Sequence, residues 1–276
     1  MIPGLISSIT TVRNGEAYLR EAIDSLLAQD DPAFEVVVVD DGSTDATPDI
    51  LRSYQDPRLT VRSVPPTGRA QALAEAVRTS RGELLAVLDA DDAALPRRFA
   101  LQRRYLEEHP EVALVGSAAV EFEGSREWRR PVPSGPPAVR RAMGMYNPFY
   151  HSSVMFRREA YEAVGGYRPD GGWGHDKDFL IRMTARYAVD ILPEPLIRYR
   201  RHPQQMSTNP AGETFRRRKS AALQLAAARE LKLAPHLWLF PLLSWGYAHL
   251  PGALRPRGLK EPVKRFLLRA LRIARP

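Results

Sequence analysis

Short apolar runs alternate with helix-like segments from residue 5 to residue 88, and this alternation constrains the fold more than any other feature of the chain. The runs typical of strands are residues 5–11, 34–39, 59–64 and 84–88, and the segments typical of helices are residues 16–29, 47–54 and 69–78. The second strand contains four consecutive valines, which suits a strand covered on both faces. This β-α-β-α-β-α-β order predicts an α/β fold with a doubly wound, mostly parallel sheet and helices on both faces.

Acidic residues follow two of these strands. Asp40 and Asp41 come directly after the valine run, and Asp89, Asp91 and Asp92 follow the fourth strand. Ligands of doubly wound sheets bind beyond the carboxyl ends of the strands. Both acidic clusters are therefore predicted to meet in one crevice.

The cluster after the fourth strand has two interpretations. Carboxylates that crowd together repel one another, so three of them within four positions favour a positive group among them. A hard divalent cation, Mg²⁺ or Mn²⁺, prefers oxygen ligands and keeps open positions that phosphate oxygens can fill. The alternative is an Asp-rich turn that provides the N-cap of a helix starting near Pro96. The cluster taken alone does not decide between the two.

Length and composition limit the architecture. The chain has 276 residues, of which 44% are hydrophobic, and this suits one large α/β domain plus an appendage. We expect the domain to cover residues 1–210 and the helical appendage to cover residues 211–276. The absence of cysteine excludes disulfides and thiolate metal sites. The first residues lack the basic start and apolar stretch of a signal peptide, so a cytoplasmic protein is expected.

The formal net charge of +8 is distributed unevenly. Residues 252–276 contain eight basic residues and one acidic residue, and residues 213–232 contain six basic and two acidic residues. Residues 233–251 contain no Asp, Glu, Lys or Arg. Because residues 213–276 thus carry +11, the first 212 residues carry −3. A mildly acidic body is followed by a strongly basic tail.

The tail combines aromatic and basic residues. Residues 233–251 contain two tryptophans, a phenylalanine and a tyrosine, but their apolar part is too short to span a bilayer. From Pro262 the spacing places apolar residues on one helical face and basic residues mostly on the other. This composition favours contact with an anionic membrane surface. The alternative is a helical appendage that packs on the sheet domain with solvated arginines. The acidic body offers no continuing basic track, so no nucleic-acid partner is expected.

The middle of the chain is less regular. Residues 112–123, 127–131, 151–156, 189–192 and 196–199 have the composition of strands, and residues 176–186 have that of a helix. The last two of these strands are expected to close the sheet.

Several segments then occur in a recognisable order. They are residues 8–16, "FEVVVVDDGSTD", "RGELLAVLDADDAALP", "HSSVMFRR" and "GGYRPDGGWGHDKDF". The ordered series resembles the family 2 glycosyltransferases, which have the Rossmann-like GT-A fold, over residues 5–203; the tail lies outside it. The resemblance implies an inverting enzyme that transfers a sugar from a nucleotide-sugar donor.

The family's first strand and the aspartate after its second strand contact the base and ribose of the donor. The matching positions here are Thr11, Arg13 and Asp41, and a carboxylate accepts well from a nucleobase N–H. The alternative for Asp41 is a solvent-facing residue of an Asp-Asp-Gly-Ser turn. In the next helix the family's usual asparagine is replaced by Ala74, and Arg69 is expected to reach the diphosphate.

Asp89 and Asp91 match the family's metal-binding motif, which implies Mn²⁺ or Mg²⁺ as cofactor. The metal bridges phosphate oxygens and neutralises the charge that grows as the anomeric bond breaks. Asp91 is expected to be the direct ligand, Asp89 a ribose or metal contact, and Asp92 a supporting residue. His202, in "YRRH", matches a C-terminal histidine that completes the metal or diphosphate site; a structural histidine after a strand is the alternative.

The family's catalytic base is the aspartate of a Glu-Asp pair that opens a helix, and the matching position is Asp176. An inverting transfer needs one carboxylate to take the proton from the acceptor hydroxyl. The preceding residue is His175 rather than glutamate, a departure that bears on how Asp176 is held. The alternative is that Asp176 or Asp178 is an N-cap. Asp178 is also spaced to pair with Arg182.

Four further residues match the family's donor-sugar and acceptor pocket. His151 and Ser152 belong to the strand-like run 151–156, for which core packing is the alternative. Trp173 and His175 precede the base, and Trp173 is expected to stack on a sugar ring.

The resemblance implies a UDP-sugar donor, with dTDP- and GDP-sugars as alternatives, and a glycan or lipid-linked acceptor. The predicted role is bacterial cell-surface polysaccharide synthesis at the inner face of the cell membrane. One rival is a catalytically silent relative that binds the nucleotide sugar as a subunit. Another is a sugar nucleotidyltransferase, which requires a Gly-rich basic loop where Asn14-Gly15-Glu16 stands.

Overall fold

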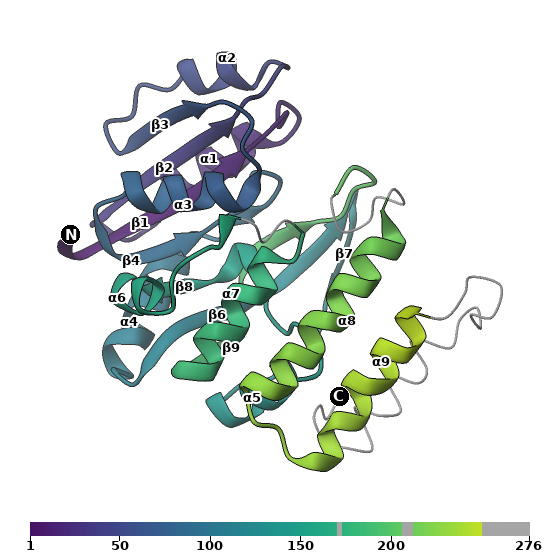
Figure 1. Cartoon of the computed structure of the whole chain (residues 1–276). Helices are drawn as coiled ribbons and strands as arrows, with labels where there is room; N and C mark the ends of the chain where they lie inside the picture. Colours follow the sequence, from purple (N-terminus) through teal and green to yellow (C-terminus); the bar gives the residue numbers. More distant parts are fainter. Residues whose placement is uncertain (170–172, 206–211, 250–276) are drawn as a thin grey trace.

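The computed structural model describes residues 1–169, 173–205 and 212–249 (Figure 1). The strands are β1 Ile2–Val12, β2 Phe34–Asp41, β3 Leu59–Val64, β4 Gly82–Val87, β5 Ala93–Ala94, β6 Val112–Glu123, β7 Arg126–Arg129, β8 Met155–Arg157 and β9 Ala188–Arg200. The α-helices are α1 Leu19–Leu27, α2 Thr47–Arg52, α3 Arg69–Thr79, α4 Arg98–Glu108, α5 Pro136–Met143, α6 Arg158–Ala163, α7 His175–Arg186, α8 Glu213–Glu230 and α9 Leu239–His249. Two 3₁₀ helices are described, His151–Ser153 and Pro235–Trp238.

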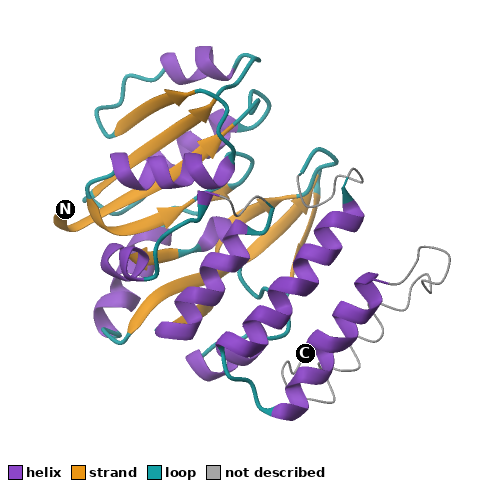
Figure 2. Cartoon of the chain, in the orientation of Figure 1, coloured by secondary structure: helices purple, strands orange, loops and turns teal. Residues whose placement is uncertain are grey.

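One sheet runs through the molecule in the order β3-β2-β1-β4-β8-β6-β9-β5, and β7 pairs with β6 (Figure 2). Strands β1 to β4 are parallel to one another, which confirms the doubly wound arrangement predicted for the first half. The carboxyl ends of β2 and β4 therefore lie at the same edge of the sheet, on either side of β1.

The valine run of β2 explains why helices cover both faces. Val36 and Val38 belong to one buried cluster, which includes the inner face of α1. Val37 and Val39 belong to the other, which includes the inner face of α3. Alternate residues of a strand point to opposite faces, so four valines in a row fill both cores.

Two predictions for the second half are wrong in detail. Residues 151–156 are a 3₁₀ turn followed by β8, because both the N–H and the hydroxyl of Ser153 donate to the carbonyl of Tyr150, at 2.9 and 2.8 Å. The two predicted closing strands are one strand, β9, which pairs with β6 in parallel. Its register shifts around Pro193 and Pro195, so bulges accommodate the prolines that suggested a break.

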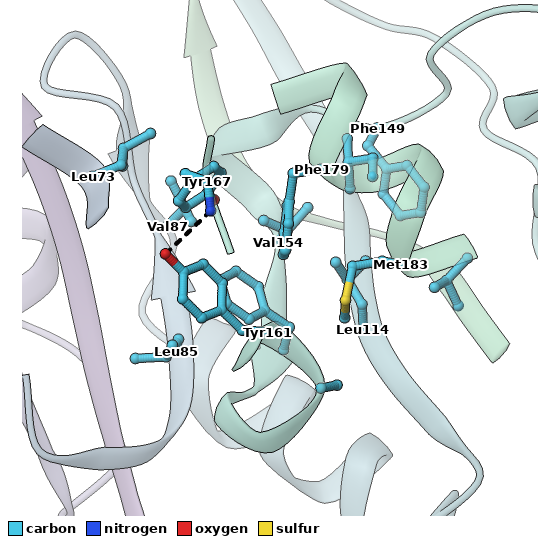
Figure 3. Packing of buried hydrophobic residues seen from close by; sticks show 14 of the residues in the cluster. Leu73, Leu85, Val87, Leu114, Phe149, Val154, Tyr161, Tyr167, Phe179 and Met183 are labelled. Carbon is cyan, nitrogen blue, oxygen red and sulfur yellow. Dashed lines mark hydrogen bonds between the residues drawn. The ribbon is translucent and has the colours of Figure 1, made fainter. Parts of the chain in front are cut away.

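Helix α7 is fixed by aromatic packing against the sheet. The ring of Phe179 lies 5.7 Å from that of Tyr161 and 4.8 Å from that of Tyr167 (Figure 3). The N–H of Tyr167 donates to the hydroxyl of Tyr161 at 3.2 Å. This packing holds the position of α7, whose first turn carries Asp176.

The helices α8 and α9 form a hairpin on the outside of α7 (Figure 1). Ala227 and Leu231 join the same buried cluster as α7, and Leu237 and Phe240 pack against Ala142 near the end of α5. The part of the appendage that is described therefore packs on the sheet domain. None of the described helices has the length and apolarity that crossing a membrane requires. The amphipathic segment predicted from Pro262 lies outside the described residues, and the boundary at residue 210 stays a prediction.

Candidate functional site

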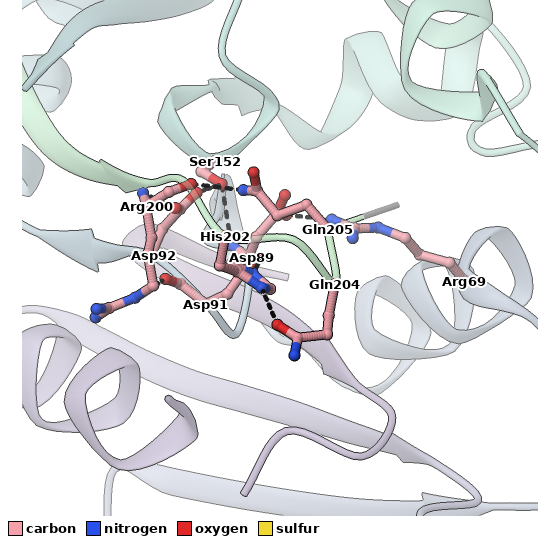
Figure 4. Close-up of polar contacts among 9 residues, drawn as sticks. All are labelled: Arg69, Asp89, Asp91, Asp92, Ser152, Arg200, His202, Gln204 and Gln205. Carbon is pink, nitrogen blue, oxygen red and sulfur yellow. Dashed lines mark hydrogen bonds and ion pairs between the residues drawn. The ribbon is translucent and has the colours of Figure 1, made fainter. Parts of the chain in front are cut away.

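Three carboxylates gather beyond the carboxyl end of β4. Oxygens of Asp89, Asp91 and Asp92 all lie within 4.8 Å of one another, and no other such group of acidic or histidine side chains is found among the described residues (Figure 4). The N–H of Asp92 donates to the carbonyl of Asp89 at 3.1 Å, which folds the segment into a tight turn. The alternative of an N-capping aspartate is wrong, since the N-cap of α4 is Arg97 and no side chain caps that helix.

Asp92 is the buried member of the cluster, with 1% of its surface exposed. One of its carboxylate oxygens accepts from the Ser152 hydroxyl, and the other accepts from the N–H of Arg200 at 2.8 Å. Burial and the charges of Asp91 and Asp89 raise its pKa well above the ordinary value. Asp92 is thus the anchored member of the cluster, and its predicted supporting role stays a prediction.

Arg69, the first residue of α3, is the cation nearest to Asp89 and donates to its carboxylate. Burial raises the pKa of Asp89, but the charge of Arg69 and the contacts of His151 and Ser152 outweigh it, so the pKa is lowered. Burial likewise opposes the charged form of Arg69, whereas Asp89, Asp91 and Asp176 together raise its pKa. Asp89 is therefore ionised and Arg69 protonated at neutral pH.

His202 closes the other side of the cluster. Its Nε2 lies 3.0 Å from a carboxylate oxygen of Asp91, and its Nδ1 lies 3.2 Å from the side-chain oxygen of Gln204. Its ring packs on that of Tyr18, with centroids 4.9 Å apart. The structure thus brings His202 to the acidic cluster, as the resemblance implied.

Arg200 is a residue of this site that sequence reasoning missed. Its Nε donates to the carbonyl of Asp91 at 2.9 Å, and its Nη2 donates to the carboxylate of Glu21 in α1. Its guanidinium lies 4.4 Å from the centroid of the Tyr18 ring, the ring that packs on His202. Arg200 therefore ties the end of β9 both to the acidic turn and to α1.

A second missed residue is Arg98, which is fully buried at the start of α4. Its Nη2 donates to the carbonyls of Val87 and Val154, at 2.8 and 3.3 Å. Burial lowers its pKa to about 9, against the opposing effect of Asp92 and Asp89. A positive charge thus lies behind the carboxylates. The only sequence signal for it was a double arginine after Pro96.

Asp176 lies in the first turn of α7, and no described residue donates a hydrogen bond to its carboxylate. Its charge acts on Arg69, the partner of Asp89, so Asp176 lies in the neighbourhood of the acidic cluster. Asp178 differs, because it accepts from Arg182 at 3.0 Å, which confirms the predicted pair. The N-cap of α7 is Gly174, at φ 88°, so neither aspartate is the N-cap.

The histidines beside Asp176 are buried. His151 has its Nε2 2.9 Å from the hydroxyl of Tyr167 and its Nδ1 3.7 Å from a carboxylate oxygen of Asp89. The ring of His175 meets that of His151 edge-on, with centroids 6.0 Å apart. His151 and His175 thus form a packed layer between Asp89 and α7.

Ser152 is buried, and its oxygen accepts from the N–H of Asp89 at 3.3 Å while its hydroxyl donates to Asp92. Trp173 is partly exposed, directly before α7. The sugar contacts predicted for Ser152, Trp173, His151 and His175 stay predictions.

The predicted nucleoside residues lie at the same edge, near the ends of β1 and β2. Thr11 is buried and Arg13 is exposed. Asp41 is 4% exposed, so it is not the solvent-facing turn residue of the alternative. Its carboxylate accepts from the N–H of Thr67 at 2.6 Å and from that of Gly68 at 3.0 Å, which fixes the residues just before Arg69. The predicted nucleobase contact of Asp41 stays a prediction.

Comparisons with known protein families and curated proteins find clear relatives. Residues 7–165 match the family described as "Glycosyl transferase family 2". The "Amylovoran biosynthesis glycosyltransferase AmsE" of Erwinia amylovora is 30% identical over 187 residues, covering 66% of this chain and 70% of that protein. The "Putative glycosyltransferase EpsE" of Bacillus subtilis is 28% identical over 274 residues, covering 94% of each.

Solved structures are similar over most of the chain. S. aureus TarS 1–349 in complex with UDP-GlcNAc superimposes with a TM-score of 0.69 at 19% identity, covering 89% of this chain and 72% of that one. The mannosyltransferase PcManGT of Pyrobaculum calidifontis, in complex with GDP-Man and Mn²⁺, gives a TM-score of 0.61 at 25% identity, covering 89% and 70%. The family match includes the acidic cluster but ends before Asp176 and His202.

Proposed function

The chain belongs to glycosyl transferase family 2, has the predicted GT-A fold and is a nucleotide-sugar-dependent glycosyltransferase; on this premise we propose that it is an inverting, metal-dependent enzyme. The observation that carries the proposal is the position of Arg69. Arg69 donates to Asp89 of the acidic cluster, and the charges of Asp91 and of Asp176 from α7 also act on it. The proposed metal ligands and the proposed base thus lie around one arginine.

The donor set fits a Mn²⁺ or Mg²⁺ ion. Asp91 offers a carboxylate oxygen beside the His202 imidazole, 3.0 Å away, and Asp89 has a lowered pKa that keeps it ionised. Carboxylates suit both ions, and the added imidazole favours Mn²⁺. When bound, the ion supplies charge neutralisation for the leaving diphosphate. The Mn²⁺ in the mannosyltransferase complex supports this assignment.

Arg69 and Asp41 act on the donor in this proposal. Arg69 is held over the crevice by Asp89 and exchanges this contact for an oxygen of the diphosphate. Asp41 fixes Thr67 and Gly68, which precede Arg69, and contacts the nucleobase together with Thr11 and Arg13. Relatives in complex with UDP, UDP-GlcNAc and GDP-Man support a UDP-sugar donor, with GDP- and dTDP-sugars as alternatives.

Asp176 is the catalytic base of the proposed reaction. It takes the proton from the acceptor hydroxyl as the oxygen attacks the anomeric carbon, and the nucleoside diphosphate leaves from the opposite side. The diphosphate needs no protonation to leave, so no second acid is required.

The acceptor is a glycan or a lipid-linked glycan of bacterial surface polysaccharide synthesis, at the cytoplasmic face of the cell membrane. The relative named for amylovoran biosynthesis supports this role. His151, Ser152, Trp173 and His175 border the base and the acidic cluster, where the donor sugar and acceptor meet.

Calorimetric titration of UDP, dTDP and GDP, each with and without Mn²⁺, tests the donor site. We expect one nucleotide to bind, and its affinity to depend on the metal. Donor hydrolysis is then compared in Asp176→Asn and in the matched control Asp178→Asn from the same helical turn. Asp176→Asn should lower turnover by about 10²- to 10⁴-fold. Asp178→Asn should keep it. Metal-dependent binding with no hydrolysis or transfer by the wild type would instead support a silent binding subunit.

A further inference from the structure

Helix α9 carries apolar side chains on both of its sides, with Ser244, Tyr247 and His249 as its polar members, although only one side of it is buried. Its inner side contains Phe240, Pro241 and Ala248, which are buried. Its outer side carries four large apolar side chains that are about half exposed: Leu239 (53%), Leu242 (53%), Leu243 (48%) and Trp245 (45%). A helix that is apolar all round is normally buried all round.

The exposed apolar side chains are concentrated at this place. Eight large apolar residues are exposed among the described residues, and five of them lie on α8 and α9, the four above and Phe215. At 100° per residue, positions 239, 242, 243 and 245 fall within less than half of the helix circumference. The exposed apolar side chains of α9 therefore share one side of the helix, together with His249 beside Trp245, and we call this side the α9 face. Soluble monomers rarely present such a patch without a partner.

Helix α9 and the turn before it are anchored to the rest of the protein by buried contacts. Leu237 and Phe240 pack against Ala142 and Met145, next to α5. The indole N–H of Trp238 donates to the carbonyl of Leu233 at 3.2 Å. Helix α9 lies on the outer side of α8, away from the sheet (Figure 1).

We propose that the α9 face inserts into the interfacial layer of an anionic membrane. The charge pattern identifies this occupant. No charged residue occurs from 233 to 251, but α8 carries Arg216, Arg217, Arg218 and Lys219 in a row, and residues 252–276 hold eight basic residues and one acidic residue. An apolar face flanked by positive charge is the composition of helices that lie in the interface of anionic bilayers.

The geometry fits a helix that lies in the plane of the membrane. Eleven residues make a helix about 16 Å long, roughly half the thickness of a hydrocarbon core. A second copy of the chain fits the α9 face less well. It would bring residues 213–276 of two chains together, and this region carries a net charge of +11 in each chain. Membrane binding by the α9 face goes beyond the proposed function. It rests on that function in one respect only, because its role would be to bring the active site to a membrane-borne acceptor.

Vesicle co-sedimentation of the full chain tests the α9 face. We compare vesicles of phosphatidylcholine alone with vesicles that contain phosphatidylglycerol, for the wild type, the double variant Leu242→Glu/Leu243→Glu, and the control Val61→Glu. Val61 is an exposed apolar residue of β3, far along the sheet from α9. We expect binding to the anionic vesicles, weakened at least tenfold by the double variant and unchanged by the control.

A second measurement reports insertion directly. Tryptophan fluorescence is quenched by brominated lipids, and the quenching should fall in Trp245→Phe, since Trp245 is the tryptophan of the α9 face. Equal vesicle binding by the double variant and the wild type overturns the proposal. So does a wild-type dimer in sedimentation analysis that the double variant abolishes, because the face then binds a second copy. A lower melting temperature of the double variant with unchanged vesicle binding also overturns it, since residues 250–276 then cover the face.

Nucleotide titration of the same variants separates this proposal from the proposed function. The double variant should bind nucleotide as the wild type does. Vesicle binding without nucleotide binding would leave the α9 face supported and the donor site refuted.

Discussion

The aspartates at the end of β2 and those after β4 both follow a buried apolar run, but their carboxylates are satisfied in different ways. Asp40 accepts from the N–H of Ser43 at 3.0 Å, within its own turn. Asp41 accepts from the N–H groups of Thr67 and Gly68. The donors after β2 are thus mainly main-chain groups, which cannot leave without moving the loop.

After β4, Asp92 accepts from the Ser152 hydroxyl and the N–H of Arg200, but Asp89 and Asp91 have partners that carry or can carry positive charge. Asp89 pairs with Arg69, and Asp91 lies beside His202. A side chain can swing away without moving the backbone, so these carboxylates can exchange their partners for a metal ion or leave Arg69 free for a phosphate. The comparison teaches that a carboxylate satisfied by the backbone organises a loop, whereas one satisfied by mobile cations is available for chemistry.

The largest effect is expected for Asp91→Asn. This substitution tests whether a carboxylate after β4, whose partner is a mobile side chain, binds the metal. We expect turnover to fall about 10³-fold, since a metal supplies several kcal/mol to the transition state. The melting temperature should not fall, because the substitution removes one of three repelling charges. Turnover at varied Mn²⁺ and thermal denaturation measure the two. A variant that keeps its metal dependence would mean that Asp91 is not the ligand.

Arg200→Ala should give the next largest effect. Arg200 bonds the Asp91 carbonyl and Glu21, and partners of metal ligands typically contribute 10- to 100-fold to metal affinity or activity. We expect the Mn²⁺ concentration for half-maximal turnover to rise by that factor, with partial rescue in Arg200→Lys.

Arg198→Ala is the matched control for Arg200. Arg198 lies two residues earlier on β9 and pairs with Glu127. Its guanidinium packs on the ring of Phe122, and so does that of Arg200. It does not touch the acidic turn. An equal loss of metal affinity in both variants would mean that Arg200 acts only through the stability of β9.

Asp41→Asn tests the carboxylates at the end of β2, which accept hydrogen bonds from backbone N–H groups. The amide nitrogen that replaces one oxygen cannot accept, so a hydrogen bond from Thr67 or Gly68 to the buried carboxylate is lost, at a cost of about 1.5–3 kcal/mol. We expect a lower free energy of unfolding in urea, with unchanged metal dependence. Weaker nucleotide binding at unchanged stability would show that the nucleobase contact, not the loop, is the main role of Asp41.

The smallest effect is expected at the other end of β2, for Glu35→Gln. Burial raises the pKa of Glu35, but hydrogen bonds from Ser7 and Arg81 outweigh it and the pKa is lowered. The carboxylate therefore stabilises the fold above its unfolded pKa, near 4.5, and this stability is lost as the pH falls through the folded value. In unfolding experiments from pH 7 to pH 3, the variant should lose about 1 kcal/mol at pH 7 and converge with the wild type in acid. A difference that does not depend on pH would exclude this linkage.

The first half of the fold was predictable because its signals are local. The valine run and the regular alternation of strand and helix identified β1 to β4, and β3 has the predicted bounds. The turn at residues 151–153 was missed because serine hydroxyls that bond the backbone override an apolar pattern. The single strand β9 was missed because pairing with β6, which no local pattern reports, carries it past two prolines.

The candidate site was predictable only in part. The carboxylates of the cluster follow from their spacing, and the roles of His202 and Asp176 came from the family resemblance. The contact between Arg69 and Asp89 and the whole role of Arg200 depend on tertiary structure. Arg200 reaches Glu21 across 179 residues of sequence, and nothing near Arg200 in the sequence indicates that partner.

The length of β9 has a consequence for how the molecule assembles. The contacts that anchor Asp40 and Asp41 span 3 and 26 to 27 residues of sequence, so they form once the second and third strands are in place. Those that bring Arg200 to Asp92 and His202 to Asp91 span 108 and 111 residues and require β9 to dock first. Closing such long loops is slow. A nascent chain that has completed only its first four strands therefore has an anchored turn at one acidic end, whereas at the other end only Asp89 has its ionic partner, Arg69. Catalytic competence is among the last properties that the folding chain acquires.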